Sequence, residues 1–450
     1  MRVRFWGTRG SIAAPGPGTV RFGGNTSCVE VITNSGRRLI LDCGTGARLL
    51  GMELMARASK PIRATILLGH THWDHIQGFP FFAPLFVPQN EFTICAPAGV
   101  GQSLASVLSG QMEFTYFPVA LDQLPATIEY KDLTEGTYDF DGVRVITQFL
   151  NHPAISLGYR IEADDAVLVY ACDHEPFATA LWRQGAQAGL IESIVHGGDR
   201  RHALFMRHAD LLIHDAQYAP QEYAAKKNWG HSTYEYAVEL AAAADVRQLA
   251  LIHHDPTHDD AFLEGLEATA RELARERNFS IHVLCAYEGC ELEVRAPQTD
   301  RSRTVEVATA GATSPGRLRI LVVDDDPNLR LLVNSALHRE GYTVAEAEDG
   351  EQGLERVQSH RPDLILLDVN MPKMDGLAVL QQLRSRNETR EIPVLMLTAQ
   401  EGEATTRAAF DAGATDYLAK PFTVPQLSAR VRACLDRLAG RPELHETLGA

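Results

Sequence analysis

Apolar runs of strand length recur along the first two thirds of the chain, and most end in histidine or aspartate. Segments 28–33 and 38–42 are separated by NSGR, a turn signal, and so predict a pair of strands. Further buried strands are expected at 65–69, 143–149, 166–172, 210–214 and 248–252, with helices at 234–244 and 262–277. Strands that deliver polar side chains at their C-terminal ends are typical of an α/β or layered β fold that gathers ligands at one sheet edge.

The last third of the chain alternates strands and helices more regularly. Strands are predicted at 318–326, 342–349, 363–372, 392–400 and 416–422. Helices are predicted at 327–341, 350–361, 377–385, 404–413 and 424–440, the first of them with Pro at its start and Gly at its end. Five such β/α units predict a doubly wound parallel sheet whose functional site lies at the carboxyl ends of the strands.

A segment without sustained apolar period separates these two patterns. Residues 296–316 are mostly small and polar and contain no aromatic residue, which predicts a linker. We therefore expect an N-terminal domain over 1–295, the linker over 296–316, a second domain over 317–438 and a polar tail over 439–450.

Composition narrows the possible functions. The chain of 450 residues is 45% hydrophobic and 22% charged, as is ordinary for a globular protein. Its net charge of −16 disfavours general nucleic-acid binding, because attraction to phosphates dominates non-specific affinity, but it is compatible with a local cationic site. We expect a cytoplasmic protein with reduced thiols, since there is no long apolar stretch, no signal-like N-terminus and no C-x-x-C pair among the seven cysteines.

Histidines cluster in the first part of the chain. The run HTHWDH places four ligand-type side chains within six residues, namely His70, His72, Asp74 and His75. Further ligands of the same kind follow later strands: His152, Asp173 and His253. Imidazole suits zinc and a carboxylate can bridge two cations, so the pattern predicts a site for two metal ions. Such a site can activate water near neutral pH and bind a phosphoryl group.

HTHWDH matches the H-x-H-x-D-H signature, and the N-terminal part resembles the metallo-β-lactamase fold superfamily over nearly all of residues 1–295. The resemblance implies an αββα sandwich and two divalent ions, with zinc expected and manganese or iron also open. It implies one metal held by His70, His72 and His152, a second held by Asp74, His75 and His253, and Asp173 as the bridge. His254 adjoins His253, and the spacing after the apolar run LALI favours His253 as the ligand.

A second motif narrows the resemblance. The run GHST, with His231, resembles the H-S-T motif of the ribonuclease Z-like phosphodiesterase branch, and DLLIHDAQY, with Asp215, resembles its L-L-I-H-E-A element. The resemblance implies that His231 contacts the phosphate and assists the leaving group while Asp215 holds it. A departing alkoxide needs a proton or a positive neighbour, which an imidazole paired with a carboxylate can supply. Alternatively, His231 only precedes a helix that Ser232 and Thr233 cap.

Three features near the predicted metal site concern how the substrate is bound, how a ligand histidine is held and how large the substrate is. The Gly-rich segment 9–27 is expected to form a loop over the site, with Arg9 or Arg21 meeting a substrate phosphate. Asp42, which ends a strand before a Gly turn, either orients a ligand histidine or is simply a polar strand end. Enzymes that process transfer RNA commonly carry a long Gly/Pro-rich arm, which is missing where we would expect it. That and the acidic charge argue against long nucleic acid and favour a cyclic or short nucleotide.

Polar side chains also end the strands predicted in the last third: Asp324 and Asp325, Asp368, Thr398, and Lys420. Three carboxylates at one point repel each other unless a cation lies there, and Mg²⁺ is the natural occupant. A carboxylate beside Mg²⁺ can attack phosphorus, with Lys420 and Thr398 receiving the phosphoryl oxygens.

This pattern resembles the response-regulator receiver domain along its whole length. The resemblance implies that Asp368 is the phospho-acceptor and that a histidine kinase or phosphotransfer protein is a partner. It implies Mg²⁺ bound by Asp325, Asp368 and the backbone carbonyl of Asn370, with Asp324 in support and Tyr417 at the aromatic switch position.

The two halves together predict a two-component signalling protein. Its metal-dependent hydrolase domain would cleave a small phosphodiester under control of phosphorylation at Asp368, with Asp74, His231 and Asp215 as catalytic residues. Two alternatives stay open: a lactone or thioester hydrolase that does not depend on His231, and a non-catalytic metal-bound sensor or scaffold. No membrane association is expected, and a homodimer is compatible because both families often dimerise.

Overall fold

The computed structural model divides the chain into two compact units, Met1–Val305 and Glu306–Ala450. The structure describes residues 1–97, 103–178, 180–183, 187–296, 318–339, 342–386, 388–399 and 412–420, with 422, 426–427, 430–431 and 434–435. The predicted linker and tail, and most of the helices predicted at 404–413 and 424–440, lie outside these residues. The domain boundaries therefore stay predictions.

The first unit is built from two seven-stranded sheets. In order across the first sheet, the strands are β14 (Glu291–Glu293), β1 (Arg2–Gly7), β2 (Cys28–Ile32), β3 (Arg38–Leu41), β4 (Arg63–Leu67), β5 (Glu91–Pro97) and β6 (Thr127–Leu133). Across the second sheet they are β13 (His282–Cys285), β12 (Gln248–Ile252), β11 (Leu211–Asp215), β10 (Ala166–Ala171), β9 (Leu157–Ala163), β8 (Val143–Phe149) and β7 (Gly136–Phe140). The strands predicted from the sequence are all present.

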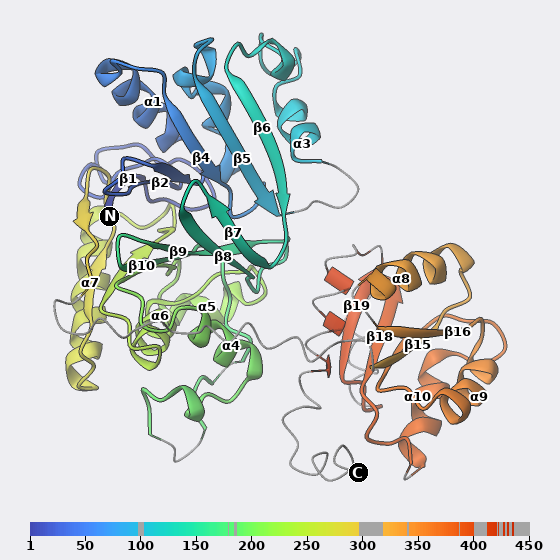
Figure 1. Ribbon diagram of the computed structural model, residues 1–450. Coiled ribbons are helices and arrows are strands. Elements are labelled where there is room, and N and C mark those ends of the chain that lie inside the picture. The colour runs from blue at the N-terminus through green and yellow to red at the C-terminus, as the bar shows by residue number, and fades with distance from the viewer. Residues whose placement is uncertain are drawn as a thin grey trace. The chain divides into compact units, whose positions relative to one another are not determined.

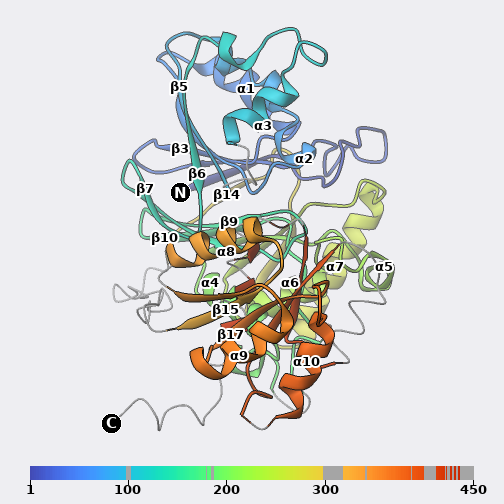
Figure 2. The ribbon, with the colours of Figure 1, turned by 90° about the vertical axis from the view of Figure 1, so that its right-hand side faces the viewer.

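Helices cover the outer faces of both sheets, so that the layers run helix, sheet, sheet, helix (Figures 1 and 2). The α-helices are α1 (Gly46–Arg57), α2 (Trp73–Ile76), α3 (Leu104–Gln111), α4 (Gly197–Phe205), α5 (Pro220–Lys226), α6 (Tyr234–Ala243) and α7 (Asp260–Glu276). Short 3-10 helices are η1 (Phe79–Phe81), η2 (Ala83–Phe86), η3 (Leu121–Gln123) and η4 (Ile191–Ser193).

The hydrophobic core of this unit lies mainly between the two sheets. Val3, Phe5 and Val29 of the first sheet belong to the same buried cluster as Ile161 and Leu168 of the second. A separate cluster packs the other face of the first sheet against α1 and α3. This packing follows from strands whose alternate side chains face the opposite sheet.

Strand direction brings the polar strand ends of the second sheet to one edge. β9 is antiparallel to both β8 and β10, so these two strands run the same way. β11 and β12 are parallel to β10, so all four strands end at the same edge of the sheet. β4, within the parallel part of the first sheet, ends just before His70.

The second unit is a doubly wound α/β domain. Its parallel sheet has the order β16 (Thr343–Ala347), β15 (Arg319–Val323), β17 (Leu364–Asp368), β18 (Val394–Ala399) and β19 (Asp416–Lys420). Its described helices are α8 (Pro327–Arg339), α9 (Gly350–His360) and α10 (Gly376–Ser385). One buried cluster includes Val333 of α8 and another includes Val357 of α9 and Val379 of α10, so both faces of the sheet are covered.

Two further observations concern the thiols and the length of the helices. All seven cysteines are free and buried, as expected for reduced thiols. Within the described parts of the chain, no helix has both the length and the apolar character needed to span a membrane.

Candidate metal centre

One helical turn after β4 carries two of the ligand-type side chains. Asp74 and His75 lie in α2, and the loop after β3 holds this turn through backbone hydrogen bonds. Cys43 N–H donates to the His75 carbonyl at 2.8 Å, and Gly78 N–H donates to the Cys43 carbonyl at 2.9 Å. A Cβ on Gly44 would lie 2.3 Å from the Asp74 carbonyl oxygen, so this close approach requires glycine.

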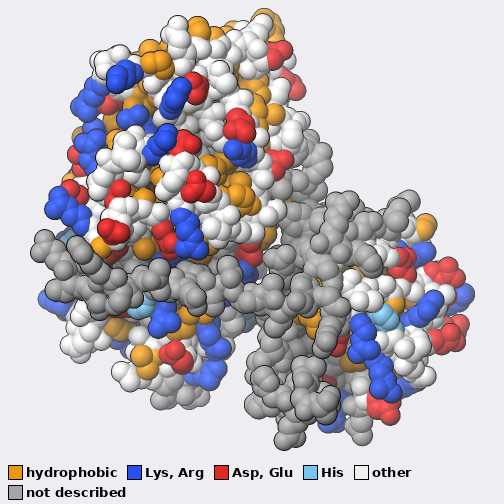
Figure 3. All heavy atoms as spheres, in the orientation of Figure 1, with side chains coloured by type: hydrophobic (Ala, Val, Ile, Leu, Met, Phe, Trp, Pro, Cys, Tyr) orange, Lys and Arg blue, Asp and Glu red, His pale blue; other side chains and the backbone are white. Residues whose placement is uncertain are grey.

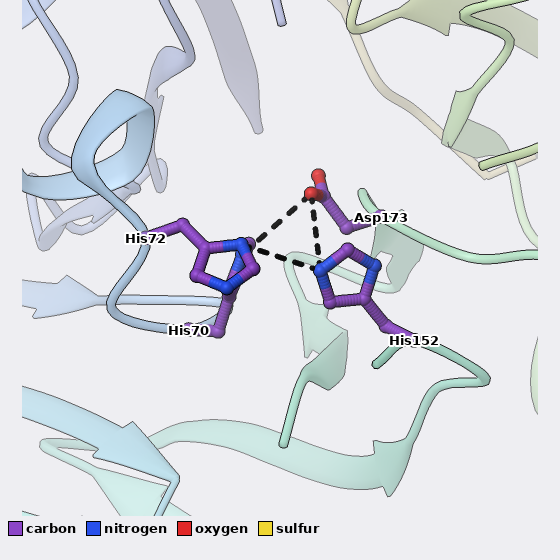
Figure 4. Close-up of side chains that lie close together, drawn as sticks. All are labelled: His70, His72, His152 and Asp173. Carbon is purple, nitrogen blue, oxygen red and sulfur yellow. Dashed lines mark hydrogen bonds and ion pairs between the residues drawn. The ribbon is translucent and has the colours of Figure 1, made fainter. Parts of the chain in front are cut away.

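A first group of ligand atoms surrounds one carboxylate oxygen of Asp173 (Figure 4). Asp173 Oδ2 lies 3.6 Å from His70 Nε2 and 3.8 Å from His152 Nε2. His152 Nε2 lies 3.4 Å from His72 Nδ1. The four residues each offer a ligand atom, and these atoms all lie within 4.8 Å of one another.

A second group surrounds the other oxygen of the same carboxylate. Asp173 Oδ1 lies 3.2 Å from both His75 Nε2 and His253 Nε2. Asp74 Oδ2 lies 3.3 Å from His75 Nε2 and 3.1 Å from His253 Nε2. Asp173 therefore stands between the two groups with one oxygen toward each.

Three of these histidines are oriented by an acceptor on their outer nitrogen. His75 Nδ1 donates to Asp42 Oδ2 at 2.7 Å, His152 Nδ1 donates to the Gly230 carbonyl at 3.0 Å, and His253 Nδ1 donates to Gln217 Oε1 at 2.9 Å. With the proton on Nδ1, the lone pair of each inward-facing Nε2 can bind a metal ion.

The buried atoms at the centre fit divalent metal ions. Among the described residues, His70 Nε2, His75 Nε2 and Asp173 Oδ1 are buried and lack a hydrogen-bond partner, which is costly unless another ligand meets them. Burial lowers the pKa of His70 well below its usual value, which favours the neutral, metal-binding form. Burial raises the pKa of Asp173, but His253, His75 and His70 outweigh it and hold that pKa well below its usual range.

His231 and Asp215 lie beside the second group. His231 Nδ1 lies 2.7 Å from Asp215 Oδ2, and the rings of His231 and His253 stack with centroids 4.8 Å apart. Asp215 Oδ1 accepts the Ser232 N–H at 3.0 Å, which fixes the carboxylate. The cap of α6 is Thr233, whose side chain accepts from a backbone N–H of the first turn, so capping does not occupy His231.

The second unit gathers its acidic residues around a lysine. Lys420 Nζ lies 2.7 Å from Asp324 Oδ2 and 3.0 Å from Asp368 Oδ1. Asp324, Asp325 and Asp368 each place a carboxylate oxygen within one group spanning at most 4.8 Å. Burial raises the pKa of Asp368, while Lys420 acts in the opposite direction.

The remaining residues predicted for this site lie on the same strands or just after them. Thr398 is buried near the end of β18, which pairs with β19. The Asn370 backbone forms a hydrogen bond that lowers the pKa of Asp368 against the effect of burial. Tyr417 on β19 is partly buried against the cluster that includes Val379 of α10.

Comparison with known protein families identifies both domains. Residues 37–254 match the beta-lactamase superfamily domain, and residues 320–432 match the response regulator receiver domain. The chain carries a beta-lactamase superfamily domain followed by a receiver domain. The resemblances to the metallo-β-lactamase superfamily and to the receiver domain are confirmed, as is the fold class.

Each similar protein covers one of the two domains. Response regulator MprA of Mycobacterium ulcerans is 49% identical over 120 residues, which are 27% of this chain and 51% of that protein. The chain thus spans about half the length of the curated relatives it matches. Vibrio cholerae chemotaxis protein CheY4 is 34% identical, with a TM-score of 0.26 over 26% of this chain and 98% of the other. The short form of human tRNase Z is 20% identical, with a TM-score of 0.44 over 66% of this chain and 100% of the other.

Some residues near the centre of the beta-lactamase superfamily domain were not singled out from the sequence. Glu175 accepts the backbone N–H groups of Asn228 at 2.7 Å and Gly230 at 2.8 Å, and so holds the loop before His231. Gln217 orients His253. The available signal was position, since Glu175 follows Asp173 by two residues and Gln217 follows Asp215 by two.

The expectation that Arg9 meets a substrate phosphate is wrong, whereas for Arg21 it stays a prediction. Arg9 is fully buried, and its guanidinium donates to backbone carbonyls, including that of Gly23 at 2.8 Å and that of His258 at 2.6 Å. Arg21 forms an ion pair with Glu264 on α7. The loop does reach the centre through its backbone.

Ser11 makes the contact between the Gly-rich loop and the metal centre, because its N–H donates to Asp74 Oδ2 at 2.8 Å.

The geometry also distinguishes the adjacent residues His253 and His254 as metal ligands. His254 Nε2 donates to the Ala286 carbonyl at 2.9 Å, on the side away from the two groups, whereas His253 Nε2 faces Asp74.

Three residues of the centre have a left-handed backbone. The φ angles are 59° for Asp42, 61° for Asp173 and 65° for His253. Aspartate tolerates this region better than most residues, while histidine there costs conformational energy. Each of the three follows a strand and turns sharply at the point where its side chain must face the centre.

A surface groove of about 940 Å³ is lined mainly by strands of the first sheet and by α1, with part of β7 and β8, rather than by the histidines. Most of its charged residues are paired, as in Arg38 with Glu30 at 2.7 Å and Arg63 with Glu91 at 2.8 Å. Figure 3 shows the same mixture of both signs on one face of this unit. Such a mosaic offers no single-sign surface to a ligand.

Proposed function

We propose that the beta-lactamase superfamily domain hydrolyses a small phosphodiester, with a cyclic or short nucleotide favoured, at a centre of two divalent metal ions. Phosphorylation of the receiver domain at Asp368 controls this activity. The observation that carries the proposal is the Asp173 carboxylate, with one oxygen toward each histidine group, beside the pair of His231 and Asp215.

The donor atoms suit zinc, with manganese or iron as the other candidates. One ion would be held by His70, His72 and His152, the other by Asp74, His75 and His253, and Asp173 would bridge them. Ions bound there supply Lewis acidity toward a phosphoryl oxygen and an activated water as nucleophile.

The chain's own side chains would manage orientation and the leaving group. Asp215 fixes Nδ1 of His231, so Nε2 is the atom free to face a substrate. A proton on that atom can pass to the departing oxygen, which would otherwise leave as an unstable alkoxide. Asp42 and Gln217 keep His75 and His253 in the orientation that binds metal.

Control would come from the receiver domain. A histidine kinase or phosphotransfer protein would donate the phosphoryl group to Asp368, with Mg²⁺ bound by Asp325, Asp368 and the Asn370 carbonyl. Lys420 already contacts the Asp368 carboxylate at 3.0 Å and would contact the new phosphoryl oxygens. The added charge can shift a two-state element of the domain.

The test is hydrolysis of bis(p-nitrophenyl) phosphate by purified protein whose metal content has been measured. Cyclic mononucleotides, cyclic dinucleotides and short RNA are assayed beside it, with and without acetyl phosphate to load Asp368. His231→Asn should lower kcat by about 10²- to 10⁴-fold at unchanged metal content, the range for loss of a general acid. His208→Asn is the matched control, because His208 forms the same kind of pair with Asp245, at 2.8 Å, on the surface.

Other outcomes would redirect the assignment. Turnover of lactones or thioesters that is insensitive to His231→Asn would favour the ester hydrolase. Two bound metals with no turnover of any ester would favour the non-catalytic sensor. Equal loss of activity in the His231 and His208 variants would contradict a direct role for His231.

A further inference from the structure

Two side chains on the loop before His231 form an exposed pair. Trp229 keeps 58% of its surface exposed, and Lys226, at the end of α5, places Nζ 4.3 Å from the centroid of the Trp229 ring. An ammonium over one face of an indole is attracted by the ring and limits its rotation. The indole therefore presents an oriented aromatic surface to solvent.

This loop is attached firmly to the metal centre. Glu175, two residues after Asp173, accepts the N–H groups on either side of Trp229, those of Asn228 and Gly230. The Gly230 carbonyl in turn accepts from His152 Nδ1 at 3.0 Å. A Cβ at Gly230 would lie 2.1 Å from that nitrogen, so the loop and the histidine are in tight contact. Trp229 is thus held at a fixed place beside the centre.

A buried hydroxyl lies in the same region. Tyr218 is 1% exposed, and its hydroxyl has no hydrogen-bond partner among the described residues. Its ring meets the ring of His231 edge-on with centroids 5.9 Å apart, and Lys226 Nζ lies 5.9 Å from its centroid. Unpaired buried hydroxyls are uncommon and usually meet a ligand or water. Burial raises the pKa of Tyr218, so the hydroxyl stays a donor.

We propose that Tyr218, Lys226 and Trp229 form a subsite for a nucleoside on the leaving-group side of the scissile phosphodiester. The base stacks on the exposed face of Trp229, and Lys226 offsets phosphate charge. The Tyr218 hydroxyl donates to an oxygen of the sugar or phosphate. Any base can stack on an aromatic ring, so this subsite selects nucleotides as a class rather than one base. The inference rests on the proposed function, since it assigns the ligand of that same site.

The probes are adenosine 5′-monophosphate and ribose 5-phosphate, which differ by the base. Their binding to the full-length, metal-loaded protein is measured by titration calorimetry. The wild type should bind the nucleotide about tenfold or more tightly than the sugar phosphate, as expected for one stacked base. Trp229→Ala should remove this preference, and Trp229→Phe should retain most of it. Lys226→Met should weaken both ligands by up to about fivefold, as for loss of an exposed ion pair.

Trp73→Ala is the matched control. Trp73 is 72% exposed and directly follows His72, but no lysine of the described residues lies over its ring. Its loss should leave the preference for the nucleotide unchanged. The melting temperature of each variant checks that it is folded.

The outcomes separate this inference from the proposed function. A preference that survives Trp229→Ala, or that disappears in Trp73→Ala, would overturn the subsite. Turnover of bis(p-nitrophenyl) phosphate without any preference for the nucleotide would overturn the subsite and leave the proposed function standing. A preference that depends on Trp229 without phosphodiester turnover would support the subsite and contradict the proposed function.

Discussion

Both units of the chain place carboxylates at the carboxyl ends of strands, but they surround them differently. In the first unit, Asp74 and Asp173 face imidazoles whose outer nitrogens are held by fixed acceptors. In the second unit, Asp324 and Asp368 share the ammonium of Lys420. An imidazole that binds a metal ion supplies a lone pair and no charge, so the carboxylates of the first arrangement are matched by added cations. The second already contains one.

The difference indicates two ways of balancing the charge of the carboxylates, by bound ions in the first unit and by a side chain in the second. Oriented imidazoles form a rigid cradle suited to ions that stay bound. An ammonium on a flexible stem can keep contact with a carboxylate and then with a phosphoryl group added to it. The first site is thus suited to repeated chemistry at a constant charge, and the second to a change of charge.

The largest effect is expected at the site of the second unit, whose charge would change on phosphorylation. Asp368→Asn should abolish incorporation of phosphate from acetyl phosphate, because the nucleophilic oxygen is lost. Labelled phosphate retained on the purified protein measures this. Asp326→Asn, on an exposed neighbour outside the acidic group, should still be labelled. Equal labelling of the Asp368 variant would place the acceptor elsewhere.

Metal removal should separate the two units next. Chelation should lower the free energy of unfolding of the first unit by about 4 kcal/mol if metal is normally present at about 1,000 times its Kd. The second unit should change little, because Lys420 already lies between its carboxylates. Scanning calorimetry of the full chain with EDTA, and again with zinc restored, measures both transitions. Equal destabilisation of the two units would contradict the expectation that only the first site depends on added cations.

A smaller effect should follow from loosening one imidazole. Asp42→Asn weakens the acceptor on His75 Nδ1 and should lower metal affinity by about 10- to 100-fold, the usual range for such supporting residues. Zinc competition with a chromophoric chelator measures it. Asp141→Asn is the control, since Asp141 also has a left-handed backbone but pairs with Arg37 on the surface. Unchanged affinity in the Asp42 variant would show that the cradle does not need this support.

Much of the architecture could be predicted from the sequence, because each strand carries its own apolar period. The ligand-type residues were also accessible, since HTHWDH is contiguous and Asp173 and His253 directly follow apolar runs. The structure brings all of them to one centre, as it does for the acidic residues around Lys420.

What escaped prediction depends on long-range packing. Arg9 lies in a Gly-rich segment that has the composition of a solvent-exposed loop, yet it is buried by carbonyls from residues 255 and 258. Glu175 holds a loop that begins more than fifty residues later, a pairing with no local signal. Trp229 reads as one apolar residue in a polar run until its loop is placed beside His152.

The left-handed backbone at Asp173 has a consequence for substitution at this position. Asparagine is the residue closest to aspartate in both shape and tolerance of this conformation, so Asp173→Asn would satisfy the fold while removing the charge between the two histidine groups. The backbone conformation alone would not oppose that exchange. A single substitution could therefore remove the charge between the two histidine groups while the backbone conformation at residue 173 is kept.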